Sequence, residues 1–84
     1  MVDVTLRFFA SARAATGREE QSLTLADGST IADALALLTA APGEPLEHVL
    51  ARCSFLVDAV STTDQQLILS DGNQIDVMPP FAGG

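Results

Sequence analysis

The chain has 84 residues, 48% of them hydrophobic, which suits one small folded domain and leaves no room for a second core. Eleven acidic residues against four arginines give a formal net charge of −7, which disfavours the phosphate backbone of nucleic acids and favours partners with basic surfaces. No apolar run approaches the roughly 20 residues of a membrane span, and the first residues, "MVDVTLRFF", lack the pattern of a signal peptide. The single cysteine cannot form an internal disulfide. We therefore expect a cytoplasmic protein without membrane partners.

The first segment, residues 2–9, alternates between apolar and polar side chains and predicts a half-buried strand. Phe9 interrupts the alternation, because it places an aromatic ring on the otherwise polar face that also carries Arg7. A second alternating segment follows at residues 21–25. The sequence between them, "ASARAATGREE", has Gly17 as its turn residue and predicts a connection, so the two strands are expected to form a hairpin.

The period then changes to that of a helix in "ADGSTIADALALLTAAPG". Thr30 or Ser29 is expected to cap the helix, with Asp33 as a weak capping-box partner three residues after Thr30. Pro42-Gly43 is expected to end it. Residues 44–52 predict one or two further helical turns. The stripe that faces the core is expected to contain Ile31, Leu35 and Leu38.

The second half of the chain predicts strands and turns. Residues 53–60 predict a third strand, with Phe55, Val57 and Ala59 facing inward. Residues 61–64 are expected to turn, residues 65–69 to form a brief extended piece, and residues 70–73 to make a tight turn. The last strand, residues 74–78, is expected to point Ile75 and Val77 inward and Asp76 and Met78 outward.

This order of elements predicts an α+β fold in which a mixed sheet of about five strands wraps one main helix. The β-grasp, or ubiquitin-like, fold accommodates that order in this length. We therefore expect a β-grasp domain over residues 1–78 and a flexible C-terminal tail over residues 79–84.

The tail, "PPFAGG", is unusual in its composition. Pro79 and Pro80 restrict the backbone to extended geometry, and six residues could reach roughly 20 Å from the domain. Gly83 and Gly84 have no β-carbon and could enter a channel too narrow for side chains. The sequence predicts an arm that delivers an α-carboxylate into the active site of another protein. The alternative is an end that frays and does nothing.

A docking patch is predicted beside this tail. If the first and last strands run parallel and adjacent, Phe9 and Met78 share the outer face of the sheet, where exposed apolar side chains indicate an interaction surface. The alternative is that Phe9 covers a sheet edge. His48 and Cys53 are each the only residue of their type and are expected to be idle, and no metal-binding pattern is present, so catalysis by side chains is not predicted.

The four basic residues are all arginines, and the chain has no lysine. Compositional bias would explain this. A second explanation is that a chain whose C-terminus becomes activated benefits from having no ε-amine to capture it. If an added surface lysine produced no self-conjugation of the activated chain, this explanation would lose its support.

The chain resembles the MoaD/ThiS sulfur-carrier family, in its molybdopterin branch. The resemblance covers nearly the whole length and rests on "LRFFASARAATG", "STIADALALL" and "LSDGNQIDVMPPFAGG". It implies that Gly84 is adenylated and then converted to a thiocarboxylate, and that Gly83 permits threading. It further implies that a docking set binds a large synthase subunit and an adenylating enzyme; this set is Phe9, Met78, Pro79, Pro80, Phe81 and Ala82.

The resemblance also implies a heterotetramer of two small and two large subunits that passes sulfur to a cyclic pterin monophosphate. The chain itself would bind no cofactor and catalyse nothing alone, since ATP and Mg are used by the adenylating enzyme. Three alternatives remain open. The chain could carry sulfur for another pathway (thiamine, cysteine or tungsten cofactor), could modify lysines of other proteins, or could be an interaction domain with an incidental terminus.

Overall fold

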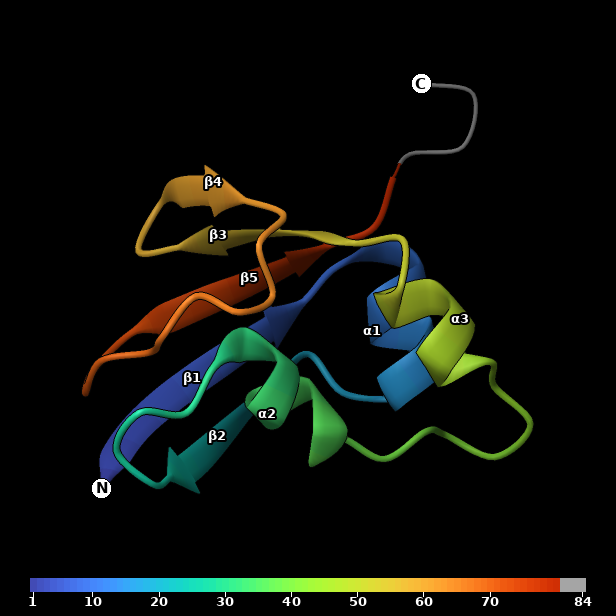
Figure 1. Cartoon of the computed structure of the whole chain (residues 1–84). Helices are drawn as coiled ribbons and strands as arrows, with labels where there is room; N and C mark the ends of the chain where they lie inside the picture. The colour runs from blue at the N-terminus through green and yellow to red at the C-terminus, as the bar shows by residue number, and fades with distance from the viewer. Residues whose placement is uncertain (81–84) are drawn as a thin grey trace.

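The computed structural model describes residues 1–80. Eight elements follow one another along these residues (Figure 1): β1 (Val2–Phe8), α1 (Ala10–Thr16), β2 (Glu20–Leu25), α2 (Ile31–Ala36), α3 (Leu46–Leu50), β3 (Ser54–Val57), β4 (Val60–Thr62) and β5 (Gln74–Met78).

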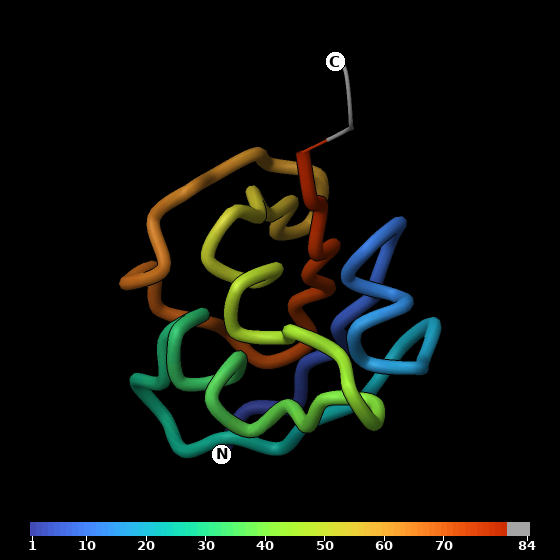
Figure 2. Tube along the Cα trace, turned by 90° about the vertical axis from the view of Figure 1, so that its right-hand side faces the viewer, coloured from blue at the N-terminus to red at the C-terminus, as the bar shows by residue number. Residues whose placement is uncertain are grey.

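The five strands form one mixed sheet in the order β2-β1-β5-β3-β4. The central strands β1 and β5 are parallel, and the other neighbours are antiparallel. The helices lie on one side of this sheet; Figure 2 shows the chain from α2 through α3 crossing the side that faces the viewer. None of the helices within residues 1–80 is long and apolar enough to cross a membrane. The α+β prediction of a five-stranded mixed sheet is confirmed.

The core lies between the sheet and the helices. Alternate residues of β1, β3 and β5 point into it, as the period of two requires. The largest side chains with almost no exposure come from three strands and from α2, and they are Phe55, Leu6, Ile31, Ile75 and Val77. The predicted helix stripe of Ile31, Leu35 and Leu38 is buried in the same cluster. Three short helices fill the concave side of the sheet, where the sequence predicts one main helix with a few further turns.

The connection between the first two strands contains a helix that the sequence analysis missed. Residues 10–16 form α1, and the strands it joins are antiparallel neighbours, as the hairpin prediction requires. No capping residue marks the start of α1 in the sequence, because the N-cap position is occupied by Phe9, whose side chain makes no capping hydrogen bond. Its end is marked by Gly17, which has a left-handed φ of 72° and donates its N–H to the Arg13 carbonyl at 2.9 Å. Ala12 and Ala15 are fully buried, so close packing stabilises the helix.

The helix α2 begins as predicted but ends early. Thr30 accepts a bond from the Asp33 N–H, and the Asp33 side chain accepts one from the Thr30 N–H, which completes the capping box. The prediction that the helix continues to Pro42-Gly43 is wrong. After Ala36 the N–H groups of Leu37 and Leu38 still donate to carbonyls three residues back, at 3.2 and 3.1 Å, but the helix goes no further. The Arg18 guanidinium instead donates to the Thr39 carbonyl and hydroxyl at 2.9 Å.

The third strand is shorter than predicted, and the fourth lies elsewhere. Asp58 and Ala59 have φ values of 47° and 71° and form a two-residue turn that pairs Val57 with Val60. Ala59 is exposed in this turn, so its predicted inward position is wrong. The turn predicted at residues 61–64 is also displaced, because β4 occupies residues 60–62. Residues 65–69 make only one isolated bridge, between Thr30 and Ile68.

Candidate functional site

The outer face of the sheet, opposite the helices, brings together the ends of β1 and β5. Their parallel register pairs Arg7 with Asp76 and Phe8 with Val77, so the next residues, Phe9 and Met78, come side by side. Phe9 keeps the extended backbone of the strand, with φ −125° and ψ 152°, and its side chain therefore continues the alternation of Arg7. Both Phe9 and Met78 are partly exposed. The structure thus places the two predicted docking residues on one face.

An ion pair lies beside this apolar pair. The Arg7 guanidinium donates from Nε to Oδ1 of Asp76 at 2.8 Å and from Nη2 to Oδ2 at 3.1 Å. These hydrogen bonds, together with the negative charge of Asp76, raise the pKa of Arg7 above its ordinary value. Asp76 is only 9% exposed, so the bidentate hydrogen bonds from Arg7 satisfy a carboxylate that has little contact with water.

The outer face contains a third apolar side chain, which the sequence analysis did not single out. Leu56 of β3 pairs with Asp76 of β5 in the antiparallel register and is partly exposed. Its neighbour Phe55 is completely buried, so Leu56 points to the opposite face by parity. Three apolar residues follow one another in "SFLV", so hydropathy does not mark Leu56 as outward, and only its parity relative to Phe55 indicates it. We call Phe9, Leu56 and Met78 the outer-face patch.

The tail leaves the domain at the edge of this patch. Ser54 pairs with Met78, and the Ser54 hydroxyl donates to the Met78 carbonyl at 3.4 Å. Pro79 is buried and Pro80 is exposed. The remaining predicted site residues lie outside the described residues, and these are Phe81, Ala82, Gly83 and Gly84.

His48 and Cys53, each the only residue of its type, lie in different environments. His48 is exposed on α3. Cys53 is buried, its thiol donates to the Val49 carbonyl at 3.2 Å, and desolvation raises its pKa to about 11. Within residues 1–80, no three His, Cys, Asp or Glu side chains gather as a metal site. A buried, protonated thiol is a poor nucleophile.

The raised pKa of Cys53 makes stability depend on pH above 8. The pKa of the folded state exceeds the ordinary value of about 8.5, so the stabilisation is complete below that pH and is lost as pH rises towards 11. The sequence has no lysine or tyrosine, which leaves the thiol as the main group that titrates between pH 9 and 11. Urea unfolding should show a falling free energy across this range, and the Cys53→Ala variant should show a flatter profile. Equal slopes in both proteins would contradict the assignment.

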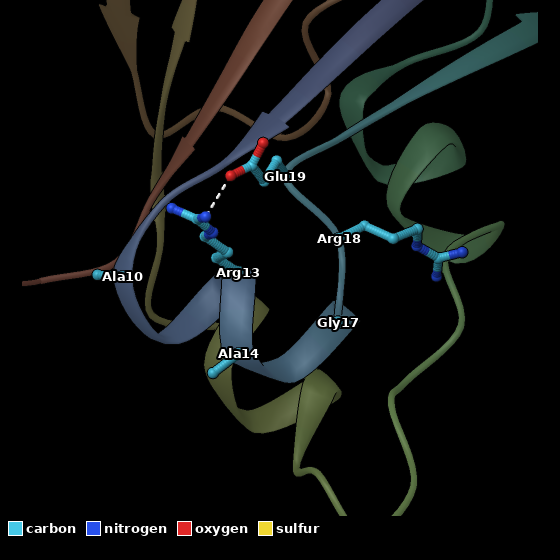
Figure 3. A pocket seen from close by; sticks show the side chains of 6 residues that line it. All are labelled: Ala10, Arg13, Ala14, Gly17, Arg18 and Glu19. Atoms are coloured by element: carbon cyan, nitrogen blue, oxygen red, sulfur yellow. Dashed lines mark hydrogen bonds and ion pairs between the residues drawn. The ribbon is translucent and has the colours of Figure 1, made fainter.

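A hollow on the α1 side does not form a second site. It is lined by Ala10, Arg13, Ala14, Gly17, Arg18 and Glu19 (Figure 3). Arg13 is paired with Glu19, whereas Arg18 points away from the hollow towards Thr39. The charged groups therefore do not converge on one point where a ligand could bind.

Comparisons with known proteins agree with the fold and extend over the tail. The ThiS family model matches residues 6–84. The molybdopterin synthase sulfur carrier subunit of Chlamydomonas reinhardtii is 32% identical over 85 residues, which cover 99% of this chain and all of that protein. Among solved structures, small archaeal modifier protein 1 of Haloferax volcanii has a TM-score of 0.77 at 16% identity, covering 96% of this chain and all of that one.

Another solved structure is the complex of subunits 1 and 2 of the molybdopterin-converting factor from Helicobacter pylori. The matched chain has a TM-score of 0.67 at 24% identity, and the match covers 99% of this chain and all of that one. These two structural likenesses establish the ubiquitin-like β-grasp fold. With a family model matched from Leu6 to the last residue and a relative aligned along its full length, the chain belongs to the ThiS family of sulfur carriers, which includes MoaD-like proteins.

Proposed function

We propose that the chain is the sulfur carrier subunit of a molybdopterin synthase. The observation that carries this proposal is the 32% identity, over the full length of both proteins, to the carrier subunit of C. reinhardtii. The match of the family model to the last residue supports it, since the match includes Gly83 and Gly84.

The proposed chemistry takes place at the α-carboxylate of Gly84. In the adenylating enzyme, a carboxylate oxygen attacks the α-phosphate of ATP, pyrophosphate leaves, and an acyl-adenylate forms; ATP and Mg²⁺ belong to that enzyme. The outer sulfur of a donor persulfide then attacks the acyl carbon, the bond to AMP breaks, and the chain is joined to the donor as an acyl disulfide. A thiol attacks the donor sulfur of this S–S bond, forms a new disulfide with the donor, and leaves the thiocarboxylate on Gly84. Gly83 lets the terminus enter both active sites, because it has no side chain.

The proposed partner for sulfur transfer is the large synthase subunit. The thiocarboxylate would donate its sulfur to a cyclic pterin monophosphate bound by that subunit, in a heterotetramer of two small and two large chains. The outer-face patch and the tail residues Pro80, Phe81 and Ala82 would form the docking surface, and Pro79, which is buried, would fix the start of the tail beside it. The H. pylori neighbour, solved as a complex of subunits 1 and 2, supports a two-subunit assembly.

Intact-mass measurement tests this proposal. Incubation with the adenylating enzyme of the same organism, Mg-ATP and a sulfur donor should replace one oxygen of the chain by sulfur. Addition of the large subunit and the pterin precursor should restore the carboxylate while the dithiolene product forms. An unchanged mass under conditions that modify a known carrier would contradict the proposal.

The likeness to small archaeal modifier protein 1 favours one second candidate, a modifier that joins Gly84 to lysines of other proteins. The same incubation separates the two functions, because a modifier gives high-mass conjugates in a cell extract. A carrier for thiamine, cysteine or tungsten-cofactor synthesis would acquire the thiocarboxylate but would not restore molybdopterin production in a strain lacking its own carrier.

A further inference from the structure

The ring of Phe9 lies against the guanidinium of Arg7. The Arg7 guanidinium carbon lies 5.6 Å from the centre of the ring, within the distance at which a cation is attracted to an aromatic face. Arg7 lies in β1 and Phe9 directly follows that strand with an extended backbone, so the two side chains, two positions apart, lie on the same face. The ring therefore packs against a charged group rather than against the apolar core, which makes its orientation dependent on that of Arg7.

Arg7 is itself fixed by the last strand. Its planar guanidinium is bound at two nitrogens by both carboxylate oxygens of Asp76, which sets the direction of its plane as well as its position. Asp76 lies on β5, two residues before Met78. The orientation of Phe9 is thus connected through Arg7 to the strand from which the tail emerges.

The backbone after Phe9 is strained. Ala10 has a φ of 49°, in the left-handed region that is unfavourable for a residue with a β-carbon. This conformation turns the chain abruptly from β1 into α1. The Phe9 carbonyl is then bound by the N–H groups of Ala12 at 3.0 Å and Arg13 at 3.3 Å. Both sides of the Phe9 peptide are fixed, by the strand before it and by the first turn of α1 after it.

We propose that Arg7, Asp76 and Ala10 are positioning residues that hold the Phe9 side chain in one rotamer, preset for an apolar pocket on the large synthase subunit. The identity of the partner rests on the proposed function, but the positioning does not. A side chain that is already ordered loses less conformational entropy on binding, so the preset ring increases affinity without adding a contact.

A measurement without any partner tests the positioning. Scalar couplings about χ1 of Phe9, measured by NMR, should indicate one rotamer in the wild-type chain. The Arg7→Leu and Ala10→Gly variants should show averaging between rotamers, and Asp76→Asn should show the same to a smaller extent. Arg7→Lys keeps the charge without the planar fork and should give partial averaging. One undisturbed rotamer in Arg7→Leu and in Ala10→Gly would overturn the proposal.

Two matched controls separate positioning from general effects. Arg18→Leu removes the same charge from a guanidinium that binds Thr39 and points away from the α1 hollow (Figure 3). Ala59→Gly makes the same backbone change at φ 71°, in the turn between β3 and β4. Neither should alter the Phe9 couplings. Averaging caused equally by the controls would also overturn the proposal.

Binding gives the second readout, with the large subunit of the same organism as the probe. The Kd should rise about three- to tenfold for Arg7→Leu and Ala10→Gly, and remain unchanged for both controls. Ala10→Gly relieves strain, so its Tm should stay the same or rise while its affinity falls, a combination that a purely structural role does not produce. If Phe9→Ala binds the large subunit weakly while Arg7→Leu and Ala10→Gly both bind with wild-type affinity, the proposal is overturned. If the wild-type chain did not bind at all, the proposed function would be wrong, and the rotamer measurement would still decide the positioning.

Discussion

Deletion of Gly84 is expected to abolish thiocarboxylate formation while leaving the fold intact. The deletion moves the carboxyl group back by one residue, about 3.3 Å, and a misplacement of even 1 Å can cost about a hundredfold in rate. Among the described residues the hydrophobic core cluster ends at Val77, seven positions before Gly84, so the free energy of unfolding should change by less than about 0.5 kcal/mol. Intact mass after incubation with the adenylating enzyme, Mg-ATP and sulfur donor gives the first quantity, and urea unfolding gives the second.

An addition at the same end serves as the matched control for this deletion. One alanine placed after Gly84, and shown by mass to remain attached, moves the carboxyl group outward by a similar distance. It should block the reaction equally, because the position of the carboxyl group matters rather than the number of residues. Normal cofactor production by this extended chain, in a strain without its own carrier, would refute the proposed role of Gly84.

Substitutions at two neighbouring positions of β3 are expected to affect different properties, one the stability of the fold and the other the binding of the large subunit. Phe55 is completely buried, and Phe55→Ala should destabilise the fold by about 3–5 kcal/mol, a large share of the 5–15 kcal/mol typical of a domain. Leu56 points to the outer face, and Leu56→Asp should weaken binding of the large subunit by at least about thirtyfold, the loss expected at an interface hot spot. Urea unfolding and a binding isotherm of each variant measure the two effects.

The comparison within this pair is more informative than either variant alone. Leu56→Asp should retain a cooperative unfolding transition because its side chain lies outside the core, with only a modest loss of stability from the new carboxylate opposite Asp76. Ser61 is paired with Leu56 on the exposed strand β4, so Ser61→Asp is a control that adds the same charge one strand away from the patch. Equal loss of binding in Leu56→Asp and Ser61→Asp would indicate a charge effect rather than a docking contact.

Local signals along the chain predict much of the fold. The capping box of Thr30 and Asp33 and the stripe of Ile31, Leu35 and Leu38 identify α2, because both depend only on residues a few positions apart. The alternation in β1 and β5 separates inner from outer residues for the same reason. Asp71 and Gly72 form the predicted turn before β5, with Gly72 at φ 85°.

Features that depend on distant residues could not be predicted. The helix α1 has no capping side chain at Phe9 and is stabilised by the burial of Ala12 and Ala15, which local sequence does not reveal. The pairing of Arg7 with Asp76 requires the register between two strands 69 positions apart. The patch of Phe9 and Met78 follows from parity, whereas Leu56 becomes part of it only when β3 is known to lie beside β5.

The central position of β5 also affects how the protein is made. Its partners are β1, from the start of the chain, and β3, so the middle of the sheet closes only after residues 74–78 have left the ribosome. Such distant pairing is the slow step in the folding of small mixed domains. A nascent chain interrupted before β5 therefore exposes its apolar strands and is open to proteolysis. The strand that completes the sheet ends at Met78 and precedes the tail of residues 79–84, so any chain that carries the two terminal glycines has also acquired the strand its folding requires.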